Sequence, residues 1–149
     1  MWQGCGVPVI VEKASEVTDE LVHAFGHLIP QLSSSNPPPT REQIAEIIAT
    51  TGNTLFAARV DGRIVGLLTL ATFRIPTGLR AWIEDVVVDE SARGHGVGEA
   101  LNRAALEDAR LRGAVTVELT SRPSREAANR LYRRLGFVQR DTNVYRYTL

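Results

Sequence analysis

The stretch Val86-Val87-Val88-Asp89-Glu90-Ser91-Ala92-Arg93-Gly94-His95-Gly96-Val97-Gly98 changes character twice. A β-branched run predicts the end of a strand, a short polar segment predicts a loop, and alternating glycines open a helix. Glycines tolerate positive φ and let a ligand approach the backbone, so successive N–H groups can converge on one anion. The helix adds its unpaired N-terminal donors and the positive end of its dipole. The stretch therefore predicts an anion site that suits a pyrophosphate, with Arg93 at its rim.

Two common nucleotide motifs do not fit these glycines. The dinucleotide fingerprint G-x-G-x-x-G would need a glycine where Glu99 stands, and a P-loop would need a lysine after the glycines, whereas Lys13 is the only lysine of the chain. A tight strand-to-helix turn, with glycines for packing, is the alternative explanation of the glycines taken alone.

Outside this stretch, turn and capping signals divide the chain into short elements. Helical periodicity covers 17–32, although Pro30 is expected to kink or end that helix early. Thr40 and Gln43 have the spacing of a capping box, and Asp61-Gly62 is typical of a β-hairpin turn. The predicted strands are 7–11, 54–60, 63–73, 81–88, 115–120 and 145–149, and the predicted helices are 17–32, 40–52, 96–112 and 125–135.

The order β-α-α-β-β-β-α-β-α-β predicts an α+β fold with a central, mostly antiparallel sheet and helices packed on both of its faces. The strand–helix–strand passage 81–120 predicts one parallel pair inside that sheet. The Ser/Pro-rich segment 33–39 is too short to separate domains, so we expect a single domain over 1–149.

Composition excludes several classes of protein. At 44% hydrophobic and 23% charged residues the chain resembles a soluble globular protein. The lone Cys5 excludes an internal disulfide framework and, by itself, a cysteine zinc cage. The first 20 residues carry four acids rather than a basic start, and no apolar run is long enough to span a membrane. We expect a cytoplasmic protein.

The net charge of zero hides an asymmetry. Up to Ala92 there are six basic and eleven acidic side chains, and from Arg93 onward there are eleven basic and six acidic ones. The two parts therefore carry −5 and +5. This split is consistent with an anionic ligand on the later part, and equally with solvated faces that are unevenly distributed by chance.

The motif Arg93-x-x-Gly96-x-Gly98 resembles the R/Q-x-x-G-x-G/A signature of the GNAT superfamily of acetyl-CoA-dependent N-acetyltransferases. The preceding Ile83-Glu84-Asp85-Val86-Val87-Val88-Asp89 is similar to that family's fourth strand. Thr120-Ser121 and Arg125-x-x-Ala128-x-x-x-Tyr132-x-x-x-Gly136-Phe137 are similar to its later segments. The resemblance extends from Ile83 to Phe137 and implies a GNAT-like fold.

The resemblance also implies how acetyl-CoA would bind as co-substrate. The backbone of Val86 and Val88, with Val87 between them, would pair with the pantetheine arm as an added strand would. Amides of the glycine loop would hold the pyrophosphate, and two residues on or before the last helix would lie beside the cofactor. The predicted cofactor-binding set is Val86, Val87, Val88, Arg93, Gly94, His95, Gly96, Val97, Gly98, Glu99, Arg125 and Asn129.

For catalysis, the resemblance implies direct attack of an amine on the thioester in a ternary complex. Tyr132 stands at the family's usual general-acid position, and a backbone N–H near Val86 would stabilise the oxyanion. Glu84 and Asp85 are adjacent on a strand and are expected to point to opposite faces. Some family members have a carboxylate that serves as the catalytic base at the position of Trp82. Because this chain lacks it, we expect Glu84 to deprotonate the amine through a water molecule.

Other candidates are weaker. His23 and His27 have a metal-ligating spacing on one helix, but no third ligand is evident, so no metal site is predicted. Ser121 lacks the local setting of a nucleophile. We expect a small-molecule amine as acceptor, cationic or phosphorylated, selected by the first two helices, by 33–39 and by 76–78.

Three rival functions remain open at this point: acetylation of peptide or protein amines, a non-catalytic acetyl-CoA sensor, and DNA binding through the eleven late arginines. The DNA-binding class lacks a recognition-helix signature. No membrane partner is expected, and homodimerisation through the C-terminal strands is a further prediction.

Overall fold

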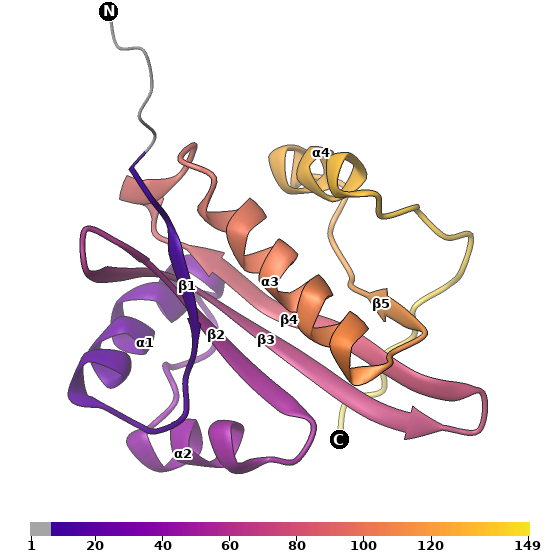
Figure 1. Cartoon of the computed structure of the whole chain (residues 1–149), viewed down its shortest axis with the longest axis horizontal. Coiled ribbons are helices and arrows are strands. Elements are labelled where there is room, and N and C mark those ends of the chain that lie inside the picture. The colour runs from indigo at the N-terminus through magenta and orange to yellow at the C-terminus, as the bar shows by residue number, and fades with distance from the viewer. Residues whose placement is uncertain (1–6) are drawn as a thin grey trace, which may run out of the picture. The chain divides into compact units, whose positions relative to one another are not determined.

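The computed structural model describes residues 7–149, and a five-stranded sheet organises most of them (Figure 1). The elements, in chain order, are β1 (Ile10–Lys13), α1 (Asp19–Leu32), α2 (Arg41–Ala49), β2 (Asn53–Val60), β3 (Arg63–Ile75), β4 (Gly78–Val88), the 3₁₀ turn η1 (Glu90–Ala92), α3 (Val97–Arg112), β5 (Thr116–Glu118) and α4 (Glu126–Leu135). Cys5, near the start of the chain, lies outside the described range.

The sheet order is β1-β2-β3-β4-β5. The first three pairs are antiparallel, and β4 pairs with β5 in parallel, with α3 as the connection between them. The predicted α+β class, the mostly antiparallel sheet and the single parallel pair are confirmed. The hairpin turn also forms as predicted, because Asp61 (φ 50°) and Gly62 (φ 76°) both adopt the left-handed conformation that a tight hairpin requires.

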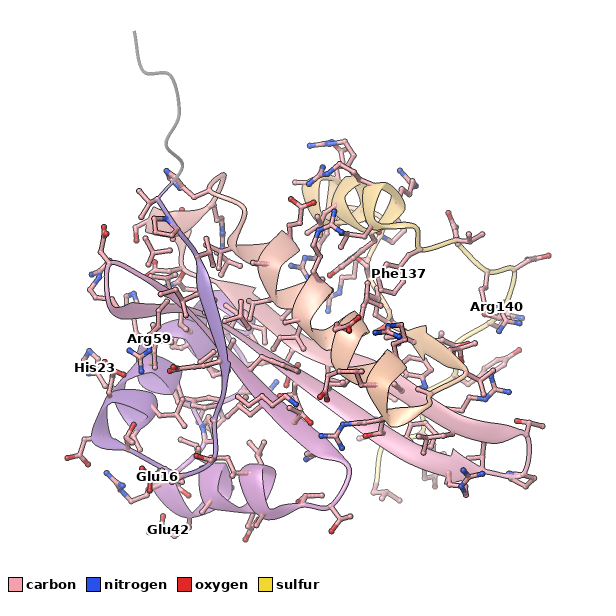
Figure 2. All side chains as sticks on the ribbon, in the orientation of Figure 1. Glu16, His23, Glu42, Arg59, Phe137 and Arg140 are labelled. Atoms are coloured by element: carbon pink, nitrogen blue, oxygen red, sulfur yellow. The ribbon has the colours of Figure 1, made fainter. Side chains whose placement is uncertain are left out.

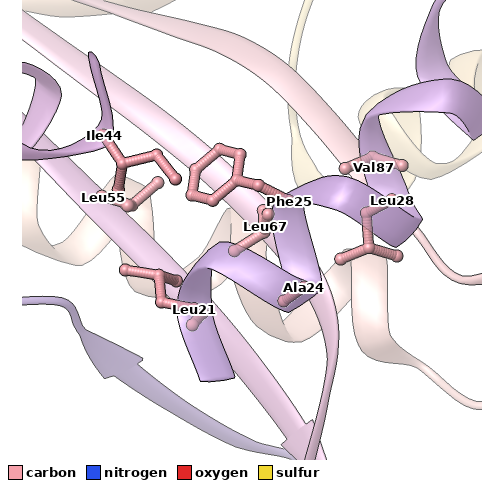
Figure 3. Close-up of a cluster of buried hydrophobic side chains, with 9 residues drawn as sticks. Leu21, Ala24, Phe25, Leu28, Ile44, Leu55, Leu67 and Val87 are labelled. Atoms are coloured by element: carbon pink, nitrogen blue, oxygen red, sulfur yellow. The ribbon is translucent and has the colours of Figure 1, made fainter. Parts of the chain in front are cut away.

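Helices cover both faces of the sheet. The main hydrophobic cluster joins α1, α2 and one face of the strands, and its members are Leu21, Ala24, Phe25, Leu28, Ile44, Leu55, Ala57, Leu67 and Val87 (Figure 3). On the other face, a Cβ atom at Gly66 would lie 3.0 Å from the side chains of both Val97 and Leu101 of α3. Consecutive residues 66 and 67 thus contact opposite layers, as strand geometry requires.

The described chain divides into two compact units. The first extends to Leu119 and holds the sheet with α1, α2 and α3, and the second, Thr120–Leu149, holds α4. The expectation of one domain over 1–149 stays a prediction. No helix among residues 7–149 is long and apolar enough to cross a membrane.

Three local predictions need correction. Residues 145–149 form no strand, and Tyr145, Tyr147 and Leu149 are among the most exposed apolar side chains. An alternating pattern makes a strand only when a neighbouring strand accepts its hydrogen bonds, and none in the described range does. The single chain therefore does not form the C-terminal strand through which we expected dimerisation, and the homodimer stays a prediction.

Pro30 does not end α1, which continues to Leu32. Its missing N–H forfeits the bond to the Gly26 carbonyl, whereas the Ser33 N–H still donates to the Ile29 carbonyl at 2.9 Å and closes the helix. The buried residues of α1 precede the proline, and beyond it Leu32 is partly buried against the hydrophobic cluster and keeps the last turn on the sheet. The ends of two strands also differ from the prediction. The first strand, predicted at 7–11, begins at Ile10, and the strand predicted at 115–120 is confined to Thr116–Glu118.

Candidate active site

The sheet opens between β4 and β5. Their pairing covers Arg80–Thr116, Ala81–Val117 and Trp82–Glu118 and stops there, whereas β4 continues to Val88. Beyond Trp82, no strand of the described residues pairs with this edge of β4. The backbone of residues 83–88 therefore offers unpaired hydrogen-bonding groups on one side, as an edge strand does.

A β-bulge decides which residues of β4 present these groups. Leu67 of β3 pairs with Val87 and Thr69 pairs with Glu84, so Leu68 alone faces the two residues Asp85 and Val86. Asp85 adopts a positive φ of 49°, which is rare for a residue with a side chain. We predicted that Glu84 and Asp85 point to opposite faces of the sheet because side chains alternate along a regular strand. This bulge interrupts that alternation, so the argument does not apply to these two residues.

Hydrogen bonds before and after the bulge show the change of direction. The carbonyl of Leu79 accepts from the Val115 N–H at 2.8 Å, on the β5 side, whereas the N–H of Asp89 donates to the carbonyl of Val65 in β3 at 2.7 Å. Both are odd-numbered residues, yet they face opposite edges, because the bulge inserts one extra residue. After the bulge, Val86 and Val88 direct their backbone groups toward the open edge.

The glycine loop between η1 and α3 is open to solvent. Gly94 (φ 81°) and Gly96 (φ 78°) hold left-handed conformations, and a Cβ atom at either would meet nothing within 4 Å. Gly96 is the N-cap of α3 and provides no side-chain acceptor for the first turn. The first N–H groups of α3 are thus left for water or an anion. Val97 contributes only its backbone here, because its side chain is buried.

The other predicted cofactor residues have mixed surroundings. Arg93 is exposed, and the ring Nδ1 of His95 donates to the Ala92 carbonyl at 3.2 Å. In the second unit, Asn129 donates to the carbonyls of Arg122 and Arg125, both at 2.9 Å. These two bonds use the amide hydrogens of Asn129 to fix the start of α4 and leave its oxygen as an acceptor.

Glu84 lies two residues after Trp82, where β4 leaves β5. Desolvation by the surrounding protein, and then the negative charge of Asp85, raise the pKa of the Glu84 carboxyl above its ordinary value. A carboxylate whose pKa is raised is a stronger base once it is deprotonated.

In the second unit, Tyr132 lies on α4 and is only 8% exposed. Its ring packs edge-on against Phe137, with the centroids 5.7 Å apart. Burial raises the pKa of the Tyr132 hydroxyl, and the positive charge of Arg125 offsets this only in part. The hydroxyl therefore keeps its proton at neutral pH, which is the state a general acid needs.

Sequence reasoning missed the residues that hold the corner between β4 and the glycine loop. Asp89 is 8% exposed, and its carboxylate accepts from His27 of α1 at 3.0 Å and from the Ser91 N–H at 3.2 Å. Gln31 of α1 accepts from the Glu90 N–H at 2.9 Å. His27 and Asp89 are 62 residues apart in the sequence, so no local pattern joins them.

His27 thus takes part in a hydrogen-bond network with Asp89. Within residues 7–149, no three histidine, cysteine, aspartate or glutamate side chains come together in a way that could hold a metal ion.

Comparison with known proteins agrees with this geometry. The Acetyltransferase (GNAT) family model matches residues 17–137. Glucosamine 6-phosphate N-acetyltransferase 1 of Oryza sativa subsp. japonica is 32% identical over 138 residues, which cover 86% of this chain and 81% of that protein. Mycothiol acetyltransferase of Thermomonospora curvata is 37% identical over 90 residues, which cover 60% of this chain but 29% of that protein.

A solved structure is also similar over nearly the whole chain. The crystal structure of an acetyltransferase from Trypanosoma brucei superposes with a TM-score of 0.77 at 27% identity, covering 95% of this chain and 100% of that one. The matched family model, the relative from rice and the shared fold agree with the resemblance seen in the sequence. The chain belongs to the GNAT family and is an acetyl-CoA-dependent N-acetyltransferase.

Proposed function

We propose that the chain transfers the acetyl group of acetyl-CoA to the primary amine of a small molecule, by direct attack in a ternary complex. The observation that carries this proposal is the open edge of β4, which leads directly into a loop of exposed backbone donors. The rice and Thermomonospora relatives are named for small-molecule substrates, which favours this acceptor class over peptide or protein amines.

In this proposal, acetyl-CoA binds along β4. The backbone groups of Val86 and Val88 pair with the pantetheine arm, with Val87 between them, because the bulge turns these two residues to the open edge. The N–H groups from Gly94 to Glu99 hold the pyrophosphate, and Arg93 adds a positive charge. Asn129 and Arg125, which belong to the second unit, are proposed as further cofactor contacts.

The proposed chemistry assigns one proton transfer to each of two side chains. The amine nitrogen attacks the thioester carbonyl carbon, and a water molecule passes the amine proton to Glu84. A backbone N–H near Val86 stabilises the oxyanion. As the C–S bond breaks, the Tyr132 hydroxyl gives its proton to the leaving thiolate. The raised pKa of the Glu84 carboxyl supports its role as a base, and the Tyr132 hydroxyl carries at neutral pH the proton that it is proposed to donate.

For the acceptor, we propose an amine whose fit is set by α1 and α2, by the segment 33–39 between them, and by the turn 76–78 that leads into β4, the strand that carries Glu84. A phosphorylated amino sugar is the first compound to assay, because the rice relative is named for glucosamine 6-phosphate. A cytoplasmic location and a homodimer are part of the same proposal and await cell fractionation and light scattering.

The test is a panel of amines assayed by release of free thiol, with the wild type and two tyrosine variants. Tyr132→Phe removes the proposed acid, and we expect kcat to fall by about 10²-fold. Tyr147→Phe removes the same hydroxyl from a side chain that is 88% exposed, and it should leave kcat unchanged. Equal rates for Tyr132→Phe and the wild type contradict the acid assignment. No thiol release with any amine contradicts small-molecule transfer.

A further inference from the structure

Two side chains of α1 reach the corner where the coenzyme-binding loop begins, and the proposed chemistry uses neither of them. His27 contacts the Asp89 carboxylate at 3.0 Å, and Gln31 accepts from the N–H of Glu90 at 2.9 Å. One helix thus holds two consecutive residues of the corner, one through its side chain and the other through its backbone.

The proton positions in this network follow from what each group can donate. A carboxylate only accepts, so Nε2 of His27 carries the hydrogen that Asp89 receives. Gln31 also places its amide nitrogen 3.3 Å from that Nε2, but two donors cannot bond to each other. The Gln31 nitrogen donates instead to the His27 carbonyl, also at 3.3 Å. Gln31 is thereby oriented with its oxygen toward Glu90.

Asp89 passes this restraint to the loop. Its carboxylate accepts from the Ser91 N–H, its carbonyl accepts from the Ala92 N–H at 2.9 Å, and its own N–H donates to Val65. Burial of this carboxyl raises its pKa, but the Ser91 amide and His27 overcome that effect and leave the pKa below its ordinary value. The carboxylate is therefore charged and fully engaged at neutral pH.

The segment that follows has local restraints: the His95 ring donates to the Ala92 carbonyl at 3.2 Å, and the Arg93 N–H donates to the Glu90 carbonyl at 3.4 Å. Residues 93–96 are exposed, and a Cβ atom at Gly94 or Gly96 would meet nothing within 4 Å. Amides that must converge on one anion bind it more tightly when their positions are fixed beforehand, because less conformational entropy is lost on binding. The contacts of α1 with Asp89 and Glu90 add such fixing at the start of the loop.

We propose that His27 and Gln31 are positioning residues for the coenzyme, acting through Asp89 and Glu90 to hold the start of the glycine loop. This inference rests on the proposed binding of the coenzyme pyrophosphate at that loop. It gives α1 a second role, because the segment 33–39, which we propose shapes the acceptor site, follows this helix directly. The helix thus connects the acceptor-selecting segment to the coenzyme loop.

The test measures the Kd of coenzyme A by isothermal titration calorimetry in four variants. His27→Ala removes the donor, and we expect Kd to rise about tenfold, with Gln31→Ala giving a smaller rise in the same direction. His27→Gln keeps an N–H donor near the position of Nε2 and should restore most of the affinity. His23→Ala is the matched control: His23 lies one turn earlier on α1, is exposed and points outward (Figure 2).

The Kd separates positioning from general stability. Loss of folded protein lowers the number of binding sites per chain but leaves the Kd of the remaining sites unchanged. Hydrogen exchange of the 90–97 amides, measured without ligand, should also be faster in His27→Ala than in His23→Ala. An unchanged Kd in both His27→Ala and Gln31→Ala, or an equal rise in His23→Ala, overturns the inference. A wild type that binds no coenzyme A overturns the proposed function itself.

Discussion

At Glu84, desolvation and the neighbouring charge of Asp85 both raise the pKa of the carboxyl above 4.5. A base acts when it is deprotonated, so kcat/KM should rise with pH through the raised pKa of Glu84. Asp85→Asn removes the like charge, lowers the pKa of Glu84 and should move this limb of the profile to lower pH. The shift is checked by measuring kcat/KM from pH 4 to 8 in buffers of constant ionic strength.

The matched variant is Glu84→Gln, which should remove that limb and lower the plateau rate by about 10²-fold. If the limb stays in place in both variants, another group supplies the base.

Asp108 is 6% exposed and is bonded by Lys13, by Arg112 (Nε, 2.8 Å) and by the Thr54 hydroxyl. Burial raises the pKa of this carboxyl, but the bonds from Lys13 and Arg112 overcome that effect and leave the pKa below 3.8. A lowered folded-state pKa stabilises the protein above the unfolded-state pKa, and this contribution disappears as the pH falls through the folded-state value.

We therefore expect Asp108→Asn to cost about 3 kcal/mol at pH 7 and to flatten the loss of stability below about pH 4. Urea unfolding between pH 3 and 7 measures both effects. Asp141→Asn, at an exposed aspartate, should leave the curve as it is. A parallel acid limb in Asp108→Asn would assign the acid sensitivity to other groups.

At the scale of elements, two glycines give opposite predictions for the same change. Gly66→Ala places a methyl group 3.0 Å from Val97 and Leu101 and 3.3 Å from the Val87 carbonyl, so it should separate α3 from the sheet and cost about 1–2 kcal/mol. Gly26→Ala lies on the exposed side of α1 with nothing within 4 Å and should stabilise by about 1 kcal/mol. Thermal unfolding distinguishes the two, and equal shifts would contradict the packing argument.

The elements that the sequence predicted well are those whose signals are local. The Thr40–Gln43 capping box forms with both of its bonds, and α3 and α4 end at Gly113 and Gly136 in the left-handed conformation. A cap or a tight turn is decided by residues a few positions apart, so a single sequence contains the whole signal.

The features that escaped prediction depend on distant partners. The bulge at Asp85 exists only in relation to Leu68 of β3, and the network at Asp89 needs His27 from α1. The 145–149 segment has the alternation of a strand but no strand beside it in the described range. The family motif in the sequence predicts candidate site residues, whereas nothing in the sequence predicts the contacts of His27 and Gln31 with Asp89 and Glu90.

Over the whole chain, the excess positive charge lies in the second unit and not around the glycine loop. Residues 93–119 carry four arginines and four acids, so the positive charge does not begin at Arg93. The second unit, Thr120–Leu149, has seven arginines and two acids and carries the entire +5. A unit of 30 residues with this charge should attract an anionic coenzyme over a distance of about one Debye length.

We accordingly expect the association rate of coenzyme A to fall as the salt concentration rises. The double variant Arg130→Gln and Arg133→Gln should weaken this salt dependence, whereas Arg63→Gln and Arg74→Gln, in the first unit, should leave it unchanged. Stopped-flow binding at increasing ionic strength measures the slopes, and identical slopes in both double variants would contradict long-range attraction by the second unit.

The extra residue in β4 has a consequence for how this sequence can vary. Because the open edge offers backbone groups, substitutions among apolar residues at 86 and 88 leave the proposed coenzyme contacts in place. Deleting Asp85 would leave almost every side chain unchanged, yet it would restore the regular alternation and turn Val86 and Val88 toward β3. Between Glu84 and Val87, we expect selection to preserve the number of residues more strictly than their identity.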